Sequence, residues 1–367
     1  MPKNRRRATI NDVAVLSGVS TATVSRVLNN PSLVNPDTRR KVLSAVAELK
    51  YRPDAAARTL ASKKTNTIGL IFTEISGDFF SQLLRGIEKI AQAHDYNLMV
   101  YSTGLNPSFD FLSPPPLGDH NTDGLIVFVN CLPDHEIIRL YDENFPLVLL
   151  HQSPPKGIHI PFITVENVEG ARKIIDHLIE EHGYRRIAYL AGNEDQEDSA
   201  QREVGYRESL MAHGIEFDPT LIAVGGFERE KARQAVETWL AQKLSIDAIF
   251  AGDDEAAFGV FTALDQAGLA VPEDIAVVGF DDLAFSPYLR SPLTTIHSPI
   301  EEVGHRSVEL LLQLIEGKDV EEKTILPTYL VIRQSCGCEW PVEKRDLVVS
   351  NPIKTKEAVS SEDQNYD

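Results

Sequence analysis

From residue 66 onward, short apolar runs alternate with amphipathic helical patterns, and this alternation constrains the fold more than any other feature. The expected strands are continuously apolar, and they cover residues 67–72, 97–101, 124–129, 146–150, 163–165, 187–190, 248–251 and 275–280. The helices expected between them lie near residues 80–94, 168–182, 201–213, 230–240 and 254–267. Such strands are typical of parallel sheets covered on both faces. The pattern therefore predicts an α/β body of two halves, with a ligand cleft at the carboxyl ends of their strands.

Charge is distributed unevenly along the 367 residues. Residues 1–64 carry 13 basic and 4 acidic side chains, whereas the other 303 residues carry 23 basic and 50 acidic ones. The net charges are therefore +9 and −27, within a total of −18. A basic segment on an acidic chain favours a negatively charged partner, because an even negative charge would repel phosphate everywhere. The N-terminal segment is thus predicted to bind nucleic acid.

Residues 8–29, ATINDVAVLSGVSTATVSRVLN, predict two short helices around a turn. Thr9 is placed to cap the first helix, and the inward face is expected to consist of Val13, Ala14 and Leu16. Gly18 can adopt the left-handed conformation that ends this helix. A third helix is expected after Asn35 and Pro36, with an apolar stripe of Val42, Val46 and Leu49.

The second helix carries the candidate base-reading residues. Ser20 is expected to cap it, while Val24, Val27 and Leu28 point inward. Small side chains and one basic side chain remain on or near its outer face: Thr21, Ala22, Thr23, Ser25, Arg26 and Asn29. Together with the two capping residues, Thr9 and Ser20, they are the candidate DNA contacts of the two helices. The leading turn of a recognition helix is the part that meets base edges in the major groove. The alternative is an ordinary three-helix bundle with a solvated basic face.

At this point the sequence resembles the LacI family of bacterial transcription regulators. DVA, GVS, TVSRVLN and YRPDAAARTLAS correspond to the family's DNA-binding signature. The resemblance continues through NTIGLIF, TDGLIVF, HGYRRIAYLAG, IFAGDDEAAFG, VPEDIAVVGFDD, SPLTTIHSP and LPTYLVIRQSC, and covers residues 8–338. It implies an all-α helix-turn-helix DNA-binding domain (1–53), a hinge helix (54–65) and a two-lobed, periplasmic-binding-protein-like α/β effector and dimerisation domain (66–340). The implied function is a dimeric regulator, most often a repressor, that binds a double-stranded, pseudopalindromic operator.

The hinge segment has a role of its own in this family. A helix of about nine residues is marginal alone in water, so the segment is expected to fold only when two copies meet on DNA. Leu60 matches the hinge leucine that wedges into the minor groove and kinks the duplex. The alternative for Leu60 is burial against the core. Arg58 is expected to contact phosphate rather than bases.

The resemblance also implies a small-molecule effector, most often a sugar, in the cleft between the lobes. Arg202 matches the arginine that grips the ligand, and Asp281 matches its carboxylate. Phe79 and Phe80, in the loop after the first strand, and Phe227 match pocket-lining positions. A guanidinium, a carboxylate and aromatic faces suit a polyol. Arg202 could instead pair with a helix carboxylate, and the two neighbouring phenylalanines could instead be loop anchors.

Several cleft positions depart from the usual family pattern. Asp253 stands where relatives often have Asn, His151 where they often have Asp, and Ser298 where some have Gln. Asp253 with Asp281 adds negative charge, which favours a neutral or cationic ligand over a sugar phosphate. His151 is as consistent with a structural role as with a ligand-facing one. Residues 105–121 contain three consecutive prolines where relatives have a helix, so this part of the first half must differ.

The remaining features argue mainly against a metal site, a signal peptide and a membrane span. Cys336 and Cys338 were expected to be structural or incidental thiols, since no histidine stands near them in the sequence, and no metal or cofactor is expected. The start of the chain lacks the apolar core of a signal peptide, and no stretch is suited to span a membrane, so a cytoplasmic, DNA-associated protein is expected. The tail (341–367) looks disordered and acidic, without a leucine heptad, which favours a homodimer.

Three other functions are alternatives for this sequence. A sugar-binding transport or chemosensory protein would share the body but not residues 1–64. An enzyme is disfavoured because no GxGxxG, P-loop or GxSxG motif is present, and no catalytic residue is assigned. A regulator controlled by a protein partner, or without an effector, remains open.

Overall fold

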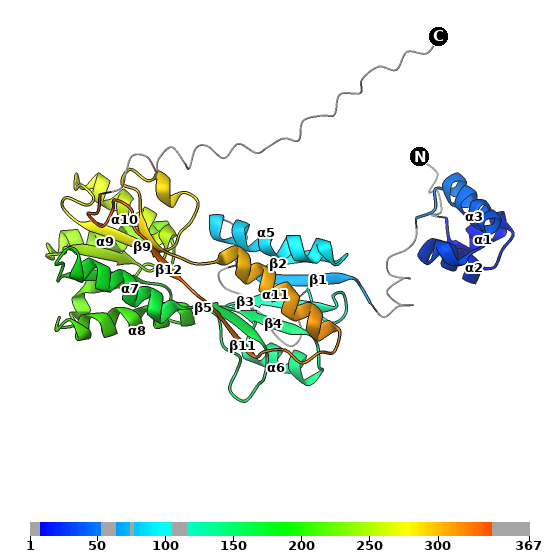
Figure 1. Cartoon of the computed structure of the whole chain (residues 1–367), viewed down its shortest axis with the longest axis horizontal. Helices are drawn as coiled ribbons and strands as arrows, with labels where there is room; N and C mark the ends of the chain where they lie inside the picture. The colour runs from blue at the N-terminus through cyan, green and yellow to red at the C-terminus, as the bar shows by residue number, and fades with distance from the viewer. Residues whose placement is uncertain (1–7, 53–63, 74–76, 105–115, 340–367) are drawn as a thin grey trace, which may run out of the picture.

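The computed structural model describes residues 8–52, 64–73, 77–104 and 116–339. The N-terminal part is a three-helix unit that stands apart from the rest of the chain (Figure 1). Its elements are α1 (Ile10–Ser17), α2 (Thr21–Asn29), a 3-10 turn (Pro31–Leu33) and α3 (Pro36–Leu49). This unit has its own small core, which includes Val13, Val24, Val27, Val42 and Ala45.

The predicted ends of these helices are confirmed. Thr9 and Asp12 form a reciprocal capping box, and Gly18 ends α1 with φ 70°. The Ser20 hydroxyl accepts a hydrogen bond from the Thr23 N–H at the start of α2. The prediction that Leu16 points inward is wrong, because this side chain is 45% exposed. At about 100° per residue, Leu16 lies about 200° around the helix from buried Ala14.

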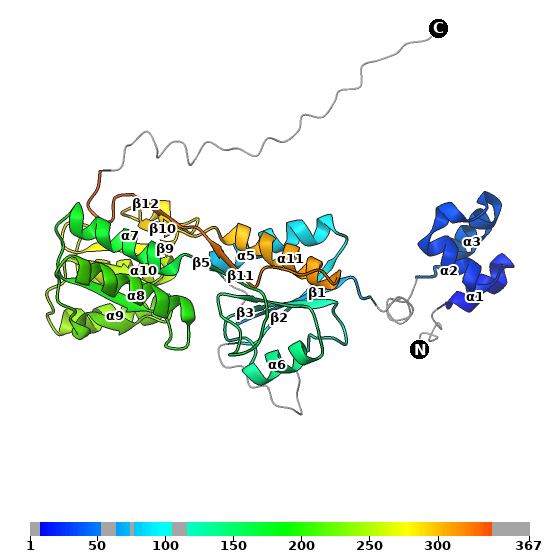
Figure 2. The ribbon, with the colours of Figure 1, turned by 60° about the horizontal axis from the view of Figure 1, so that its bottom comes forward.

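The first lobe of the body is a six-stranded sheet in the order β11-β5-β4-β3-β1-β2, and all of its neighbouring strands are parallel. Its strands are β1 (Thr67–Phe72), β2 (Asn97–Ser102), β3 (Gly124–Phe128), β4 (Leu147–Leu150), β5 (Phe162–Val165) and β11 (Lys323–Leu326). Its helices are α5 (Gly77–Ala93), α6 (Asp134–Asp142) and α11 (Ile300–Ile315). Helices α5 and α11 pack side by side on one face, and α6 lies on the other (Figure 2).

The second lobe has the strand order β12-β10-β9-β8-β6-β7, in which only the β10–β12 pair is antiparallel. Its strands are β6 (Ile187–Ala191), β7 (Ile222–Val224), β8 (Ala248–Ala251), β9 (Ala276–Asp281), β10 (Thr294–His297) and β12 (Tyr329–Val331). Its helices are α7 (Asn167–Glu180), α8 (Glu197–Ala212), α9 (Arg229–Ala241) and α10 (Asp254–Gln266). Helix α7 packs on α8, and α9 packs on α10.

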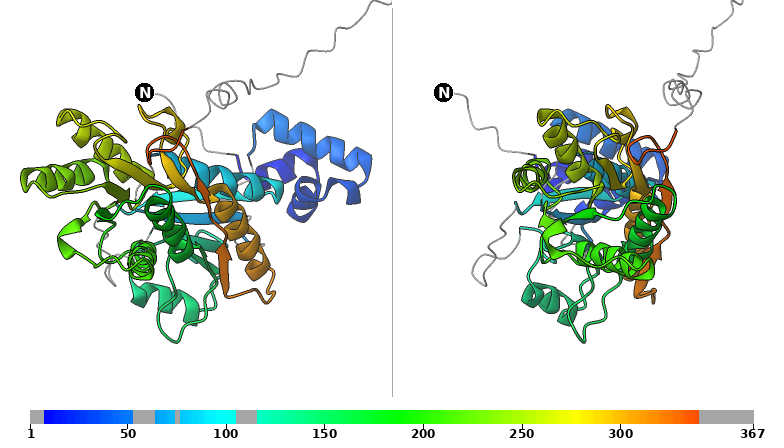
Figure 3. Two further views of the ribbon diagram at one scale, coloured as in Figure 1. Left: turned by 60° about the vertical axis from the view of Figure 1, so that its left-hand side comes forward. Right: turned by 90° about the vertical axis from the view of Figure 1, so that its left-hand side faces the viewer.

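The chain passes between the lobes after β5, after β10 and between β11 and β12. Figure 3 shows these crossing segments from two further sides. Two of the crossings brace each other, because Thr328 donates from its N–H to the Glu166 carboxylate (3.2 Å) and from its hydroxyl to the Glu166 carbonyl (3.2 Å). Each lobe is therefore built from two stretches of sequence, which are separated by a stretch that belongs to the other lobe.

The strands and helices predicted from apolar periodicity are present, with ends shifted by a few residues. Phe79 and Phe80 were placed in a loop, which is wrong: they lie in the first turn of α5. The expectation for residues 105–121 falls largely outside the described residues, which resume at 116. Two further predictions stay untested because they lie almost entirely outside the described residues: the hinge helix (54–65) and the tail (341–367), together with the domain boundaries beside them. None of the described helices is long and apolar enough to cross a membrane.

Candidate functional site

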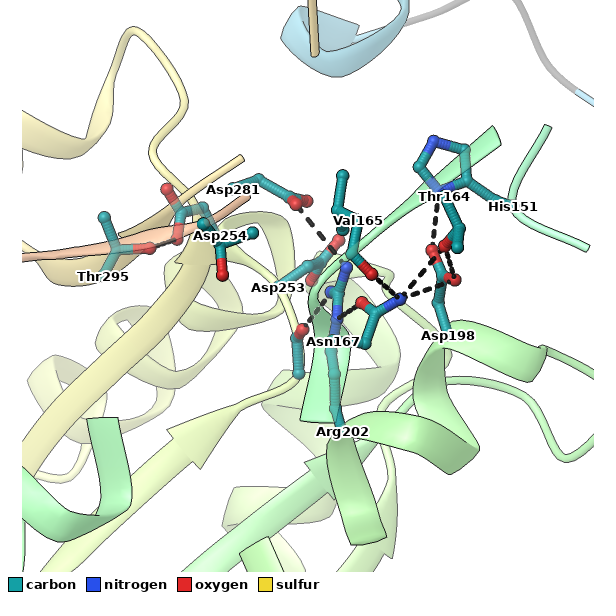
Figure 4. Close-up of polar contacts among 12 residues, drawn as sticks. His151, Thr164, Val165, Asn167, Asp198, Arg202, Asp253, Asp254, Asp281 and Thr295 are labelled. Carbon is teal, nitrogen blue, oxygen red and sulfur yellow. Dashed lines mark hydrogen bonds and ion pairs between the residues drawn. The ribbon is translucent and has the colours of Figure 1, made fainter. Parts of the chain in front are cut away.

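Four of the side chains proposed for the effector, His151, Arg202, Asp253 and Asp281, lie near one another at the carboxyl ends of strands from the two sheets (Figure 4). Arg202 stands at the centre, on α8, and is 4% exposed. Its Nε donates to the Asn167 side-chain carbonyl at 2.9 Å, and its Nη1 donates to the Gly252 backbone carbonyl at 2.6 Å. Its guanidinium also lies over the Phe280 ring, with 3.7 Å from Cζ to the ring centroid. Arg202 is therefore held rigidly before any ligand arrives.

Arg202 and Asp281 form an ion pair, which the sequence analysis did not propose as a direct contact. The Arg202 Nη2 atom lies 3.6 Å from the Asp281 Oδ1 atom, and this buried oxygen has no hydrogen-bond partner among the described residues. Asp281 ends β9 with φ 108°, a backbone conformation that L-residues rarely adopt. Burial raises the pKa of Asp281, and the positive charge of Arg202 opposes this effect.

A second polar cluster joins the two lobes through Asp198, at the start of α8. Asp198 accepts hydrogen bonds from His151 Nδ1 at 2.7 Å, from the Thr164 hydroxyl at 3.0 Å and from the Asn167 amide at 2.8 Å. His151 and Thr164 belong to the first lobe, and Asp198 belongs to the second. Burial alone would raise the pKa of Asp198, but His151, the Arg202 charge and the Thr164 hydrogen bond together lower it.

His151 has both a structural contact and an unused atom. Its Nδ1 is bonded to Asp198, whereas its buried Nε2 has no hydrogen-bond partner among the described residues. Its ring lies at the edge of an aromatic cluster, 5.8 Å from the Phe79 ring and 5.5 Å from the Phe128 ring between centroids. Phe80 completes this cluster, 5.3 Å from Phe128. The two readings of His151, structural and ligand-facing, are thus compatible.

The other predicted residues surround Arg202 less directly. Phe227 follows β7 with φ 58°, and the Arg202 guanidinium lies 5.5 Å from its ring centroid. Asp253 is the N-cap of α10, where it accepts from the Ala256 N–H at 2.7 Å. Burial and then repulsion from Asp281 hold the pKa of Asp253 well above its usual range. Ser298 is buried, and its N–H donates to the Asp281 carbonyl at 3.3 Å.

Sequence reasoning missed several participants. Asn167, Thr164, Asp198 and Phe128 were not proposed, although Asn167 and Asp198 contact the predicted residues directly. Their only signal in the sequence is their place just before, within or just after predicted strands and helices. Asp282, the residue after Asp281, accepts from His297 Nδ1 at 3.0 Å and from the Arg333 guanidinium.

The DNA-reading candidates on α2 have the exposure that contact with DNA requires. Thr21, Ala22 and Arg26 are exposed, and Thr23 and Ser25 are half-buried. Thr9 and Ser20 serve as helix caps. Arg58, Leu60 and the side chain of Asn29 lie outside the described part of the chain.

No histidine lies near the two thiols of the Cys336-Gly-Cys338 segment in the sequence, but the fold brings two histidines to them. In the structure His177 and His182 lie beside them, with the four potential ligand atoms within 4.8 Å of one another. The reason is that β12 and the segment after it return to the end of α7, about 160 residues earlier in the chain.

Two family models match the chain. Residues 9–54 match the model described as "Bacterial regulatory proteins, lacI family", and residues 175–336 match a "Periplasmic binding protein-like domain". The regulator GalS of Salmonella typhimurium is 35% identical over 84% of this chain and 90% of its own length. The regulator CelR of Thermobifida fusca is 32% identical over 91% of this chain and 99% of its own length.

Solved structures give the same result. A lac repressor dimer bound to operator and the anti-inducer ONPF has a TM-score of 0.77 at 30% identity, covering 90% of this chain and 99% of that one. A complex of the regulator CelR with cellobiose has a TM-score of 0.65 at 28% identity, covering 90% and 100%. With full-length relatives at this identity and both parts of the chain matched, the protein belongs to the LacI family and is a transcriptional regulator, not an enzyme.

Proposed function

We propose that this regulator is a dimeric repressor that acts on DNA in the cytoplasm, binding a pseudopalindromic operator through α2 and the 54–65 hinge. We further propose that a small, uncharged sugar bound around Arg202 controls this binding. The observation that carries the second proposal is a pair of buried polar atoms, Asp281 Oδ1 and His151 Nε2, without hydrogen-bond partners among the described residues. Buried polar groups are rarely left unsatisfied, so such atoms favour a bound ligand.

The groups offered at the site suit hydroxyls. The Asp281 carboxylate can accept from a sugar hydroxyl, and the Arg202 Nη2 atom can donate to a neighbouring oxygen. The Phe227 ring, beside the guanidinium, offers an aromatic face for the C–H surface of a sugar ring. A polyol can thus use donors, an acceptor and an apolar face within one small volume.

The charge of the site favours an uncharged ligand. Asp198, Asp253 and Asp281 are all buried near the Arg202 cation. Even where burial keeps Asp253 protonated, the site offers no excess positive charge for a phosphate. A phosphorylated sugar would lose its hydration without a compensating cation, and it is therefore expected to bind more weakly than the parent sugar.

The position of the site supports coupling to DNA binding. Three further contacts join the lobes near it: Ser153 to Glu197, Asn130 to Asp195 and Asp78 to the Ala284 N–H. A ligand that binds only one arrangement of the lobes shifts the population toward that arrangement. The same coupling must act in reverse, so operator must alter sugar affinity by the same factor.

Calorimetric titration tests the effector proposal. The full chain is titrated with cellobiose, ribose, galactose and glucose, and with glucose 6-phosphate as the charged counterpart of glucose. At least one uncharged sugar should bind, and glucose 6-phosphate should bind no more tightly than glucose. Tighter binding of the phosphate ester would contradict the charge argument. Absence of binding by every uncharged sugar would leave control by a protein partner as the better hypothesis.

Selection of duplexes from a randomised DNA pool tests the operator proposal. The selected sequences should show two inverted half-sites, since a symmetric dimer reads each half once. The Arg26→Ala variant should bind them with an affinity reduced by about 1–3 kcal/mol, the size of a lost base contact. The matched control is Arg40→Ala, which changes an exposed arginine on α3. A single unrepeated half-site would contradict the dimer.

A further inference from the structure

Four side chains gather at the end of the second lobe that carries the C-terminal end of α7, outside the effector site. His177 lies in the last turn of α7, and His182 follows the helix two residues after its end. Cys336 and Cys338 follow β12, the last strand of the described chain. Their potential ligand atoms all lie within 4.8 Å of one another. Cys131, the remaining cysteine, lies in the core of the first lobe.

Two distances within this cluster match those of a metal site. Cys338 Sγ lies 3.6 Å from His177 Nε2 and 3.4 Å from His182 Nε2. A tetrahedral zinc ion with bonds of about 2.3 Å to sulfur and 2.0–2.1 Å to nitrogen places its ligand atoms about 3.3–3.8 Å apart. The two imidazole rings are nearly perpendicular, with an interplanar angle of 82°, so both can direct a nitrogen toward one point.

The chain around the cysteines is shaped for this approach. Gly337 has φ 106°, and a Cβ atom at this position would lie 3.3 Å from the His182 ring and from the Tyr184 hydroxyl. Glycine therefore allows the turn between the cysteines to pass close to His182. The Tyr184 ring stacks on His182 at 5.4 Å, and its hydroxyl donates to the Cys336 carbonyl at 3.2 Å. These contacts fix the orientation of one imidazole and of the turn.

Supporting groups around the cluster also match a metal site. The Thr294 hydroxyl lies 3.1 Å from the Cys336 sulfur, where it can donate to a thiolate. Such outer-shell donors orient ligands and stabilise their charge. A set of two sulfurs and two imidazoles is selective for zinc over magnesium or calcium, which prefer oxygen ligands.

We propose that His177, His182, Cys336 and Cys338 bind one structural zinc ion per chain. The two thiols lose their protons to solvent when the ion binds, so the dication and two thiolates leave the site neutral, with both histidines uncharged. The bound ion fastens residues 336–338 to the end of α7. A zinc ion held by four protein ligands has no open position, so its role is stability rather than catalysis.

Metal binding by the untagged full chain tests this site. The protein is stripped with chelator under reducing conditions and then titrated with zinc or cobalt. We expect about one ion per chain, and cobalt should show the visible bands of tetrahedral coordination together with thiolate charge transfer. Zinc should also raise the melting temperature, since it binds only the folded site.

Matched variants assign the ligands. Cys338→Ser and His182→Gln change side chains that are only half-buried, and each should weaken zinc binding by more than about 100-fold, beyond the loss expected for an outer-shell partner. The controls are Cys131→Ser and His213→Gln, whose original side chains lie outside the cluster. Circular dichroism of each metal-free variant checks that it folds.

Several outcomes would overturn the proposal. Cobalt binding without thiolate charge transfer would exclude the cysteines as ligands. Equal zinc affinity in Cys338→Ser and the native chain would do the same, as would an equal loss in Cys131→Ser. A mass two hydrogen atoms lower, mapped to a Cys336–Cys338 disulfide in freshly reduced and desalted protein, would show that the pair is a redox couple instead.

Discussion

Asp254 and Asp281 are both buried carboxylates of the second lobe, yet their surroundings differ in kind. Asp254 accepts three hydrogen bonds, from the Leu283 N–H and from the hydroxyls of Ser286 and Thr295. Asp281 has a buried oxygen with no hydrogen bond, a 3.6 Å ion pair with Arg202 and a left-handed backbone conformation. The fold satisfies Asp254 completely and Asp281 only in part.

The difference separates a residue that stabilises the lobe from one that is available to a ligand. Gly279 illustrates the first role, because a Cβ atom there would lie only 2.2 Å from the Asp254 carboxylate. Strain and unsatisfied polar atoms, by contrast, cluster at functional sites. Substitutions at the two positions should therefore affect different measurements.

Replacement of Asp254 should produce the largest change. Asp254→Ala leaves three buried donors without an acceptor, and we expect the free energy of unfolding to fall by about 3 kcal/mol. Asp281→Asn should change it by less than about 1 kcal/mol, since Asn tolerates positive φ and Arg202 keeps its bonds to Asn167 and Gly252. Urea denaturation followed by circular dichroism measures both. A greater loss for Asp281→Asn would reverse the comparison.

Loss of the Arg202 cation should disrupt the effector site most directly. Arg202→Ala removes the fixed guanidinium and leaves Asp281 without its positive partner. We expect the affinity for the best-binding uncharged sugar to fall about 100-fold, as for a lost charged hydrogen bond. Arg207→Ala, on the exposed side of the same helix, is the matched control. Calorimetry gives both affinities, and an equal effect of the two variants would remove Arg202 from the site.

The pH dependence of stability sharpens the comparison further. Burial raises the pKa of Asp254 to about 7, although hydrogen bonds from Ser286 and Thr295 oppose the shift. The unfolded chain has the ordinary, lower pKa, so the stabilisation linked to this proton is complete at low pH and is lost as pH rises through about 7. Between pH 6 and 8 we expect a loss of about 1 kcal/mol from this group.

Asp254→Asn cannot ionise, and it provides the control for this titration. The variant should lose less stability between pH 6 and 8 than the native chain does, by about 1 kcal/mol. Urea denaturation at both pH values measures the difference. If the two proteins show the same pH dependence, Asp254 is ionised throughout the range, and its three hydrogen bonds outweigh burial.

The smallest expected effect is at the rim of the site. The Ser153 hydroxyl donates to the Glu197 carboxylate at 2.9 Å and joins the lobes where both residues are accessible to solvent. Ser153→Ala should change sugar affinity by about twofold, because exposed polar contacts contribute up to about 0.5 kcal/mol. A change above tenfold would mean that this contact, and not only the buried pair, controls how the lobes close.

Much of the architecture could be predicted because buried strands keep a simple pattern. Runs such as residues 68–72 and 248–251 lack polar side chains, which is typical of strands in a sheet covered on both faces. The strands β7, β10, β11 and β12, each of three or four residues, were not predicted. Helix α6, which is short and rich in charge, and helix α11 were not predicted either.

The candidate site was predictable only in part. Arg202 and Asp281 were found through the resemblance to a family, whereas Asn167 and Asp198 have no local pattern that marks them. His177 and Cys338 are 161 residues apart, and their contact depends on the late return of the chain to α7. Such contacts follow from topology, and sequence spacing does not contain them.

The crossing segments have a consequence for how the protein is made. The sheet of the first lobe ends in β11, residues 323–326, and α5 is covered by α11, residues 300–315. A nascent chain leaving the ribosome therefore lacks an edge strand and a covering helix of its first lobe until most of the chain has been synthesised. The helix-turn-helix unit has a core of its own from the first 51 residues. We expect the helix-turn-helix unit to fold early during translation, whereas the first lobe can complete its fold only after residues 300–326 have been synthesised.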